Sequence, residues 1–208
     1  MYKRQLYKCI KELGGEAFIV CDEPLFTAIN DKFNTIKIEH GKDSSEALLR
    51  KYNPSLLISI ERPGKNQDSR YYNMRGIDIT EKCADFDVFF ENASCPKISI
   101  GDGGNEIGMG NVELNLSSLK IKPSTTECDE LLVADVSNWG AHGLIAMLST
   151  LQNKDYLAAW ENDKTLHMLS ELGAVDGVSG KRTKTEDGFT SKETKIVINN
   201  LRKLSGFR

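Results

Sequence analysis

A glycine-rich segment at residues 98–111, ISIGDGGNEIGMGN, carries side chains and bare backbone well suited to chemistry. Five glycines surround Asp102, Asn105 and Glu106 directly after a short apolar run. Glycine costs roughly 0.5–1 kcal/mol relative to alanine in regular secondary structure, so this cluster needs a local reason. Backbone N–H groups of such a loop can point inward together and bind an anion. We therefore predict a ligand-binding loop; the structural alternative is a turn capped by Asp102 or Asn105.

Two further polar clusters follow other apolar runs. Glu61 and Arg62 begin the string ERPG, and Asn138 lies in the string SNWG. Ligands of open α/β sheets bind outside the carboxyl ends of the strands, so the three clusters are predicted to converge. Arg62 and Arg75 suit bidentate capture of a carboxylate. Glu61 is either a general base or the partner of an arginine.

Short apolar segments alternate with helical segments along the chain, which is typical of βαβ units. We predict an α/β, doubly wound fold with a mostly parallel sheet of about five strands flanked by helices. Capping-box spacing predicts helix starts at Asp43 with Glu46 and at Thr190 with Glu193. The glycine pair Gly14 and Gly15 is typical of a helix C-cap, so we predict that the first helix ends there. The predicted strands are residues 17–21, 35–39, 55–60, 97–100 and 131–135.

Composition bounds the function classes. The 208 residues favour one domain over 1–208, and the net charge of −3 argues against a nucleic-acid partner. No apolar run approaches the ~20 residues that span a membrane, and no signal peptide is visible, so we predict a cytoplasmic protein. Five cysteines without C-x-x-C spacing favour reduced thiols over a zinc site. The segment VSGKRTKTEDGFT is polar and is predicted to be a loop.

Asp102 directly follows an apolar run, where a carboxylate can bind a metal ion or a substrate ammonium group. The string GDGGNE also resembles the magnesium loop of haloacid dehalogenase-type phosphatases. The D-x-D motif of those enzymes would have to be Asp85 and Asp87, only 14 residues before Asp102, which is too little intervening chain. This spacing makes a metal-dependent hydrolase of phosphorylated small molecules the alternative enzyme and not the first prediction.

Four strings carry a more specific resemblance: SIERPG, YYNMRGIDIT, ISIGDGGNEIGMGN and VADVSNWGAHGL, in this order. The chain resembles the D-glutamate cyclase C-terminal domain family, formerly a domain of unknown function, from about residue 6 to its end. The resemblance implies a carbon–oxygen lyase (hydro-lyase) that converts D-glutamate to 5-oxo-D-proline and water. A non-catalytic sensor of an acidic metabolite is the alternative from another class.

The implied cyclisation needs a base for the α-ammonium, a clamp for the α-carboxylate and donors for the tetrahedral intermediate. The partner is a small acidic substrate, with no nucleic acid and no membrane. Mn²⁺ or Mg²⁺ is the one cofactor considered, on Asp102 and Glu106. The catalytic candidates are Glu61, Asp102 and Glu106, and the substrate-binding candidates are Arg62, Asn73, Arg75, Gly103, Gly104, Asn105 and Asn138.

The chain departs from the family pattern in two places. The resemblance implies that the family's domain begins with an additional strand and a loop rich in Gly, Pro and Asp. We predict that this element is missing here and that residues 1–5 are an assembly scar on a truncated frame. A stretch of Glu186, Asp187 and Gly188 stands where the family favours a second V-D-G. If the missing strand contributes to the site, the fragment is inactive, which is why the sensor alternative is kept.

Overall fold

A computed structural model describes residues 2–39 and 45–208 of the chain. The chain forms two compact units, and each is described by itself. The sheet unit is Phe18–Ser137, and the helical unit combines Met1–Ala17 with Asn138–Arg208. The predicted single domain over residues 1–208 stays a prediction.

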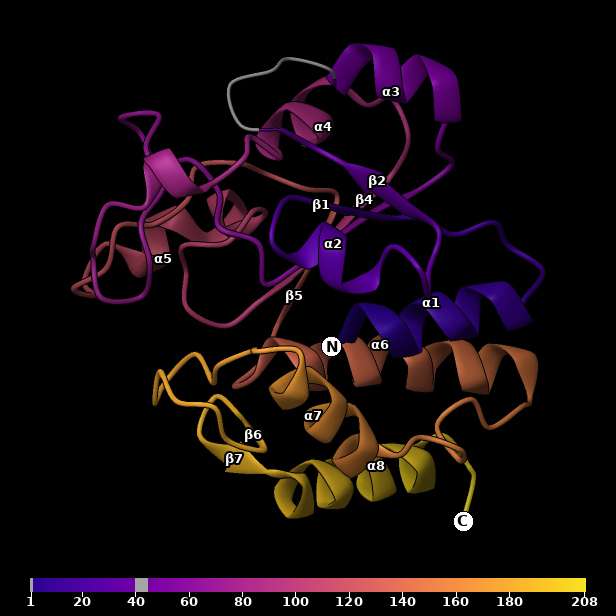
Figure 1. The fold of residues 1–208 in the computed structure, drawn as a ribbon. Helices are drawn as coiled ribbons and strands as arrows, with labels where there is room; N and C mark the ends of the chain where they lie inside the picture. Colours follow the sequence, from indigo (N-terminus) through magenta and orange to yellow (C-terminus); the bar gives the residue numbers. More distant parts are fainter. Residues whose placement is uncertain (1, 40–44) are drawn as a thin grey trace. The chain divides into compact units, whose positions relative to one another are not determined.

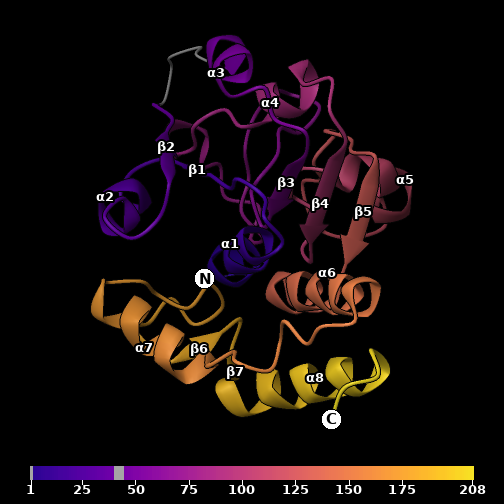
Figure 2. The same cartoon turned by 90° about the vertical axis from the view of Figure 1, so that its right-hand side faces the viewer.

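The sheet unit contains two parallel sheets, which confirms the α/β class. β1 pairs with β2, and β4 lies between β3 and β5, as Figure 2 shows. The predicted sheet of about five strands is therefore not confirmed as one sheet. Ile60 pairs with Ile100 and Gly101 pairs with Val133, so β3, β4 and β5 end nearly level. The bounds are β1 Ile19–Cys21, β2 Thr35–Lys37, β3 Leu57–Ile60, β4 Lys97–Gly101 and β5 Glu130–Val133.

Aromatic and aliphatic side chains between the strands and the short helices form the core of the sheet unit. Phe86, Phe89 and Phe90 at and around α4 are all buried and pack with Ile38 and Ile107. This burial explains why apolar residues concentrate in the segment around α4. The bounds are α2 Leu25–Ile29, α3 Ser45–Tyr52, α4 Asp87–Asn92 and α5 Glu113–Leu116, with short 3₁₀ turns at Thr80–Lys82 and Met109–Val112.

The helical unit is built from α1, most of α6, α7 and α8, together with a two-stranded hairpin of β6 and β7 (Figure 1). Ser137, the first residue of α6, still belongs to the sheet unit. Lys154 pairs with Glu12 of α1 at 3.0 Å, and Arg202 of α8 pairs with Asp155 at 2.7 Å. The bounds are α1 Tyr2–Glu12, α6 Ser137–Gln152, α7 Asn162–Glu171, β6 Thr185–Glu186, β7 Phe189–Thr190 and α8 Ser191–Leu204.

Two predicted helix boundaries are confirmed in the helical unit. α1 ends where Gly14 donates its N–H to Lys11 O and the N–H of the next residue reaches Ile10 O, the bonds of a glycine C-cap. α8 begins with a capping box in which Thr190 and Glu193 bond reciprocally. The capping box predicted at Asp43 lies outside the described residues.

The polar segment predicted as a loop differs from the structure. It contains the hairpin, because β6 and β7 pair antiparallel around a tight turn at Asp187 and Gly188. Both turn residues have positive φ, at 49° and 83°, which suits a two-residue hairpin turn. Each strand has only two residues, too few for an alternating pattern to be visible in the sequence.

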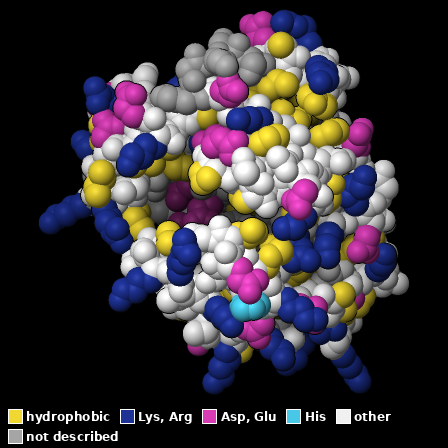
Figure 3. All heavy atoms as spheres, viewed as in Figure 1, with side chains coloured by type: hydrophobic (Ala, Val, Ile, Leu, Met, Phe, Trp, Pro, Cys, Tyr) yellow, Lys and Arg dark blue, Asp and Glu magenta, His cyan; other side chains and the backbone are white. Residues whose placement is uncertain are grey.

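Charges of both signs are interspersed over the face that Figure 3 shows. Within residues 2–39 and 45–208, no helix combines the length and the hydropathy of a membrane span.

Candidate functional site

The loops that follow β3 and β4 are joined by backbone hydrogen bonds. The N–H of Ile107 donates to the carbonyl of Arg62, and the N–H of Gly64 donates to the carbonyl of Asn105, both at 2.9 Å. The side-chain amide of Asn105 donates to the carbonyl of Tyr72 at 2.9 Å, which ties in the next loop. The structure therefore brings together the ERPG and glycine-rich clusters, and Ser137 of the SNWG cluster joins them through Asp102.

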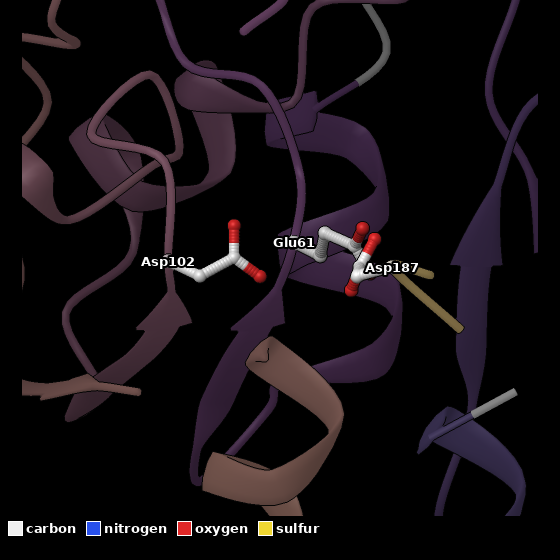
Figure 4. A group of neighbouring side chains, drawn as sticks. All are labelled: Glu61, Asp102 and Asp187. Atoms are coloured by element: carbon white, nitrogen blue, oxygen red, sulfur yellow. The ribbon is translucent and has the colours of Figure 1, made fainter. Parts of the chain in front are cut away.

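Glu61 and Asp102 present neighbouring carboxylates at the ends of β3 and β4 (Figure 4). A carboxylate oxygen of one lies within 4.8 Å of a carboxylate oxygen of the other. The register explains this proximity, because Ile60 pairs with Ile100 and both acids follow within two residues. Both side chains are half-buried. Figure 4 also draws Asp187, which is described with the helical unit below.

Asp102 is oriented by the residue that begins α6. Its Oδ2 accepts the backbone N–H of Ser137 at 2.8 Å and the Ser137 hydroxyl at 2.7 Å. The first N–H groups of a helix have no partner within the helix, so a carboxylate here satisfies one of them. Oδ1 of Asp102 makes no bond to any residue in the described ranges, and it is the oxygen available to a ligand.

Glu106 folds back onto its own loop and is buried. Its Oε1 accepts the N–H of Gly103 at 3.0 Å, and its Oε2 accepts the N–H of Gly104 at 2.8 Å. Burial raises the pKa of Glu106 above its usual value, the charge of Asp102 raises it further, and the two loop N–H groups oppose the rise. The anion-binding loop predicted from the glycines thus holds a carboxylate of the protein itself.

The surroundings of Gly103 explain why this position of the loop is a glycine. A Cβ at residue 103 would lie 2.9 Å from Oε1 of Glu106 and 2.9 Å from Oδ1 of Asn105. Only a residue without a side chain allows both polar groups to approach the backbone this closely. The bare backbone therefore serves the placement of Glu106.

Arg62 is engaged inside the protein. Its two terminal nitrogens donate to the two carboxylate oxygens of Asp22, at 3.2 and 2.8 Å. Its guanidinium also lies 3.9 Å from the ring centre of Phe86. The side chain predicted to clamp a substrate carboxylate therefore already holds a carboxylate of the chain, and Lys65 is likewise paired with Asp85 at 2.6 Å.

Asn73 and Arg75 lie in the loop that Asn105 ties to the site. The side-chain oxygen of Asn73 accepts the N–H groups of Arg75 and Ile77, both at 3.0 Å, which shapes the loop as an Asx turn. The Arg75 side chain is exposed.

Comparison with known proteins identifies the family. The family model described as D-glutamate cyclase-like, C-terminal, matches residues 4–202. The chain belongs to this family. It is 36% identical over 103 residues to the human (Homo sapiens) protein named D-glutamate cyclase, mitochondrial. That match takes in 46% of this chain and only 17% of the human protein.

Asn138 of this cyclase-like chain lies in the helical unit, where it donates to Glu186. Asn162 donates to the same carboxylate at 3.0 Å, and the hydroxyl of Thr194 donates to it as well. Glu186 is 4% exposed, so three uncharged donors stabilise a buried carboxylate. The structure thus gives Asn138 a well-defined partner within its own unit.

The D-G pairs of the cyclase-like chain pack against each other in the helical unit. Oδ2 of Asp176 accepts the N–H of Gly188 at 2.9 Å, and a Cβ at Gly177 would lie 3.2 Å from Oδ1 of Asp187. Burial raises the pKa of Asp176, but bonds from Gly188 and Ser179 outweigh it and lower the pKa to about 2. The repeated D-G was the available sequence signal for these acids, which are absent from the predicted site.

The buried His142 of the cyclase-like chain is expected to make the free energy of unfolding depend on pH. The ring is fully buried beside Trp160, with 6.0 Å between ring centres, and no described residue bonds to either nitrogen. Burial lowers its pKa from 6.5 to about 4. Between pH 7 and pH 5 a proton binds the unfolded chain and not the folded one, so acidification removes about 2 kcal/mol of stability.

His142→Phe is expected to abolish that loss while keeping the ring packing. Urea unfolding at pH 7 and at pH 5 measures the loss. Between these two pH values, the unfolding free energy of the variant should decrease by about 2 kcal/mol less than that of the wild type. His167→Phe is the matched control, because this histidine is an exposed member of an i, i+4 pair with Glu171. Equal pH dependence in the wild type and His142→Phe would contradict the prediction.

Proposed function

We propose that the chain binds D-glutamate at the Glu61–Asp102 pair and cyclises it to 5-oxo-D-proline and water. The family membership and the printed name of the human relative support the choice of reaction. The geometry supports the site through one observation: two half-buried carboxylates face each other within 4.8 Å, while the nearby cations Arg62 and Lys65 are already paired. A site with this charge favours a ligand that enters with a cationic group, such as the ammonium of an amino acid.

The reaction forms one bond and breaks one bond. The α-nitrogen of D-glutamate attacks its own γ-carboxyl carbon, a C–N bond forms, and a C–O bond of that carboxyl group breaks to release water. The ammonium must first lose a proton, because only the neutral amine is a nucleophile. The nitrogen loses a second proton after the attack, and both protons leave with the departing oxygen as water, so one residue can serve as base and then as acid.

Glu61 and Asp102 divide these roles in the proposal. Asp102 is held by two bonds from Ser137 at Oδ2, so its Oδ1 is a fixed acceptor for the ammonium group. Glu61, at the neighbouring strand end, takes each of the two protons from the nitrogen in turn and passes it to the leaving oxygen. Holding both ends of the substrate in a ring-closing shape supplies much of the rate, since effective molarities reach ~10⁵–10⁸ M in well-oriented cases.

The same two carboxylates fit a divalent cation. Carboxylate oxygens are the ligands that Mg²⁺ and Mn²⁺ prefer, and Glu61 and Asp102 offer one each within 4.8 Å. When bound, such an ion supplies Lewis-acid polarisation of the γ-carboxyl group. This assignment pairs Asp102 with Glu61, since both oxygens of Glu106 accept loop N–H groups.

Arg75 is the cation that the proposal assigns to the substrate's α-carboxylate. Arg75 is exposed on the loop that Asn105 ties to the site through Tyr72. An arginine suits this task because its guanidinium donates two parallel hydrogen bonds to one carboxylate.

Incubation with D-glutamate, followed by chiral detection of 5-oxoproline, tests the proposal. We expect 5-oxo-D-proline to accumulate from D-glutamate, in proportion to protein, and L-glutamate to give a much lower rate. Parallel reactions with added MnCl₂ and with EDTA measure the contribution of a metal. Thermal stabilisation by D-glutamate without any product would instead indicate a binding module, and no response to either measurement would contradict the proposal.

A further inference from the structure

Asp22 and Arg62 form a two-pronged ion pair between two strand-end loops of the sheet unit. Asp22 directly follows β1, and Arg62 lies two residues after the end of β3. The two nitrogen–oxygen distances are 3.2 and 2.8 Å, and both side chains are about four-fifths buried. Paired bonds of this kind fix the orientation of both groups as well as their distance.

The pair is held by a third segment of the chain. Arg62 also donates to the carbonyl of Ala84 at 3.3 Å, and the N–H of Ala84 lies 3.4 Å from Oδ2 of Asp22. The ring of Phe86 covers the guanidinium. Burial opposes ionisation of Asp22, yet the hydrogen bond and the charge of Arg62 lower its pKa below the usual value. Asp22 is therefore an ionised and strongly oriented partner of Arg62.

The residue before Arg62 has an unusual backbone. Glu61 has φ of +52°, in the left-handed region that residues other than glycine and asparagine seldom occupy. Such a residue is strained and persists only where its surroundings hold it. The N–H of Glu61 donates to Ile100 at 2.9 Å, and the Arg62 carbonyl accepts from Ile107 at 2.9 Å. Asp22 adds a side-chain restraint on this turn through its two bonds from Arg62.

We infer that Asp22 is a positioning residue for Glu61: by holding Arg62, it keeps Glu61 in its left-handed turn with its carboxylate beside Asp102. The catalytic consequence rests on the proposed function. Displacing a reacting group by about 1 Å can lower a rate 100-fold, so a loosened turn at Glu61 is expected to act on kcat.

Asp22→Asn tests the inference, with Glu23→Gln as the matched control. The control removes the neighbouring carboxylate and its ion pair with Lys37 while leaving Arg62 untouched. We expect Asp22→Asn to lower kcat on D-glutamate by roughly 10- to 100-fold, with KM changed less than about threefold. Glu23→Gln should keep both constants within about twofold of the wild type.

An activity-independent measurement separates this inference from the proposed function. Backbone NMR chemical shifts of residue 61 report its φ and ψ whether or not D-glutamate is turned over. These shifts should move toward averaged values in Asp22→Asn and stay at wild-type values in Glu23→Gln. If the wild type forms no 5-oxoproline, the proposed function fails while the shifts still decide the role of Asp22.

A double variant guards against simple unfolding. Asp22→Asn leaves a mostly buried guanidinium without its partner, whereas Asp22→Leu combined with Arg62→Met removes both charges. We expect the double variant to unfold at a urea concentration near that of the wild type and still show the altered residue-61 shifts and the low kcat. Unchanged shifts in a folded Asp22→Asn overturn the inference. A lower KM with unchanged kcat also overturns it, because Arg62 would then be a substrate clamp released from Asp22.

Discussion

Asp102→Asn is expected to lower kcat/KM for D-glutamate by at least about 100-fold, the usual scale for removing a positioned acid–base or charge partner. The substitution keeps an oxygen that can accept both bonds from Ser137, at 2.8 and 2.7 Å in the wild type. It removes only the negative charge that faces the substrate ammonium. The fold should therefore survive, with the unfolding free energy within about 1 kcal/mol of the wild type. Steady-state kinetics and urea unfolding measure the two quantities.

Glu46→Gln is the matched control for this substitution. Glu46 is an exposed carboxylate of the same unit whose ion pair with Arg50 lies along α3. Exposed pairs of this kind contribute little, so kcat/KM and stability should both stay close to wild type. Full activity in Asp102→Asn would remove Asp102 from the site. A loss of folding in that variant would assign it a structural role through Ser137.

Gly108→Ala is expected to destabilise the sheet unit by about 3 kcal/mol or more, because two costs add. Gly108 has φ of +95°, where any side chain is strained. A Cβ at this position would also lie 2.2 Å from Cβ of Ser99, which is fully buried on β4. The backbone has little room to shift, since the N–H of Gly108 donates to Thr126 at 2.8 Å. The midpoint of urea unfolding measures the effect.

Gly143→Ala provides the contrasting substitution. A Cβ there would meet no atom within 4 Å, and the residue lies inside α6. Alanine is favoured over glycine in a helix interior by up to about 1 kcal/mol, so this variant should be more stable than the wild type. Equal effects of the two substitutions would show that the crowding around Gly108 is relieved at little cost.

The parts of the site that follow from strand periodicity could be predicted from the sequence. An apolar run that ends in a charged residue places that residue at a strand end, and parallel strands bring their carboxyl ends together. This reasoning places Glu61 and Asp102 at neighbouring strand ends, where the structure has them. The division of the predicted sheet into two sheets was not visible, because pairing depends on the path of the chain in space.

The use of each polar group could not be predicted from residue types alone. Gly103 and Gly104 offer N–H groups, as expected, but the carboxylate of Glu106, three and two positions further along the chain, accepts them. Arg62 has the chemistry of a substrate clamp, yet Asp22, forty residues earlier, holds it. Tertiary geometry decides which acceptor satisfies a buried donor, so composition and spacing do not predict it.

A double-mutant cycle on the two facing carboxylates tests the account most directly. Formation of 5-oxo-D-proline from D-glutamate would be measured for the wild type, Glu61→Gln, Asp102→Asn and the variant carrying both changes. If the two groups act as one catalytic unit, each single change should remove most of the activity. The rate of the double variant should then be only slightly below that of the less active single variant. Multiplicative losses, or a wild-type rate in either single variant, would contradict it.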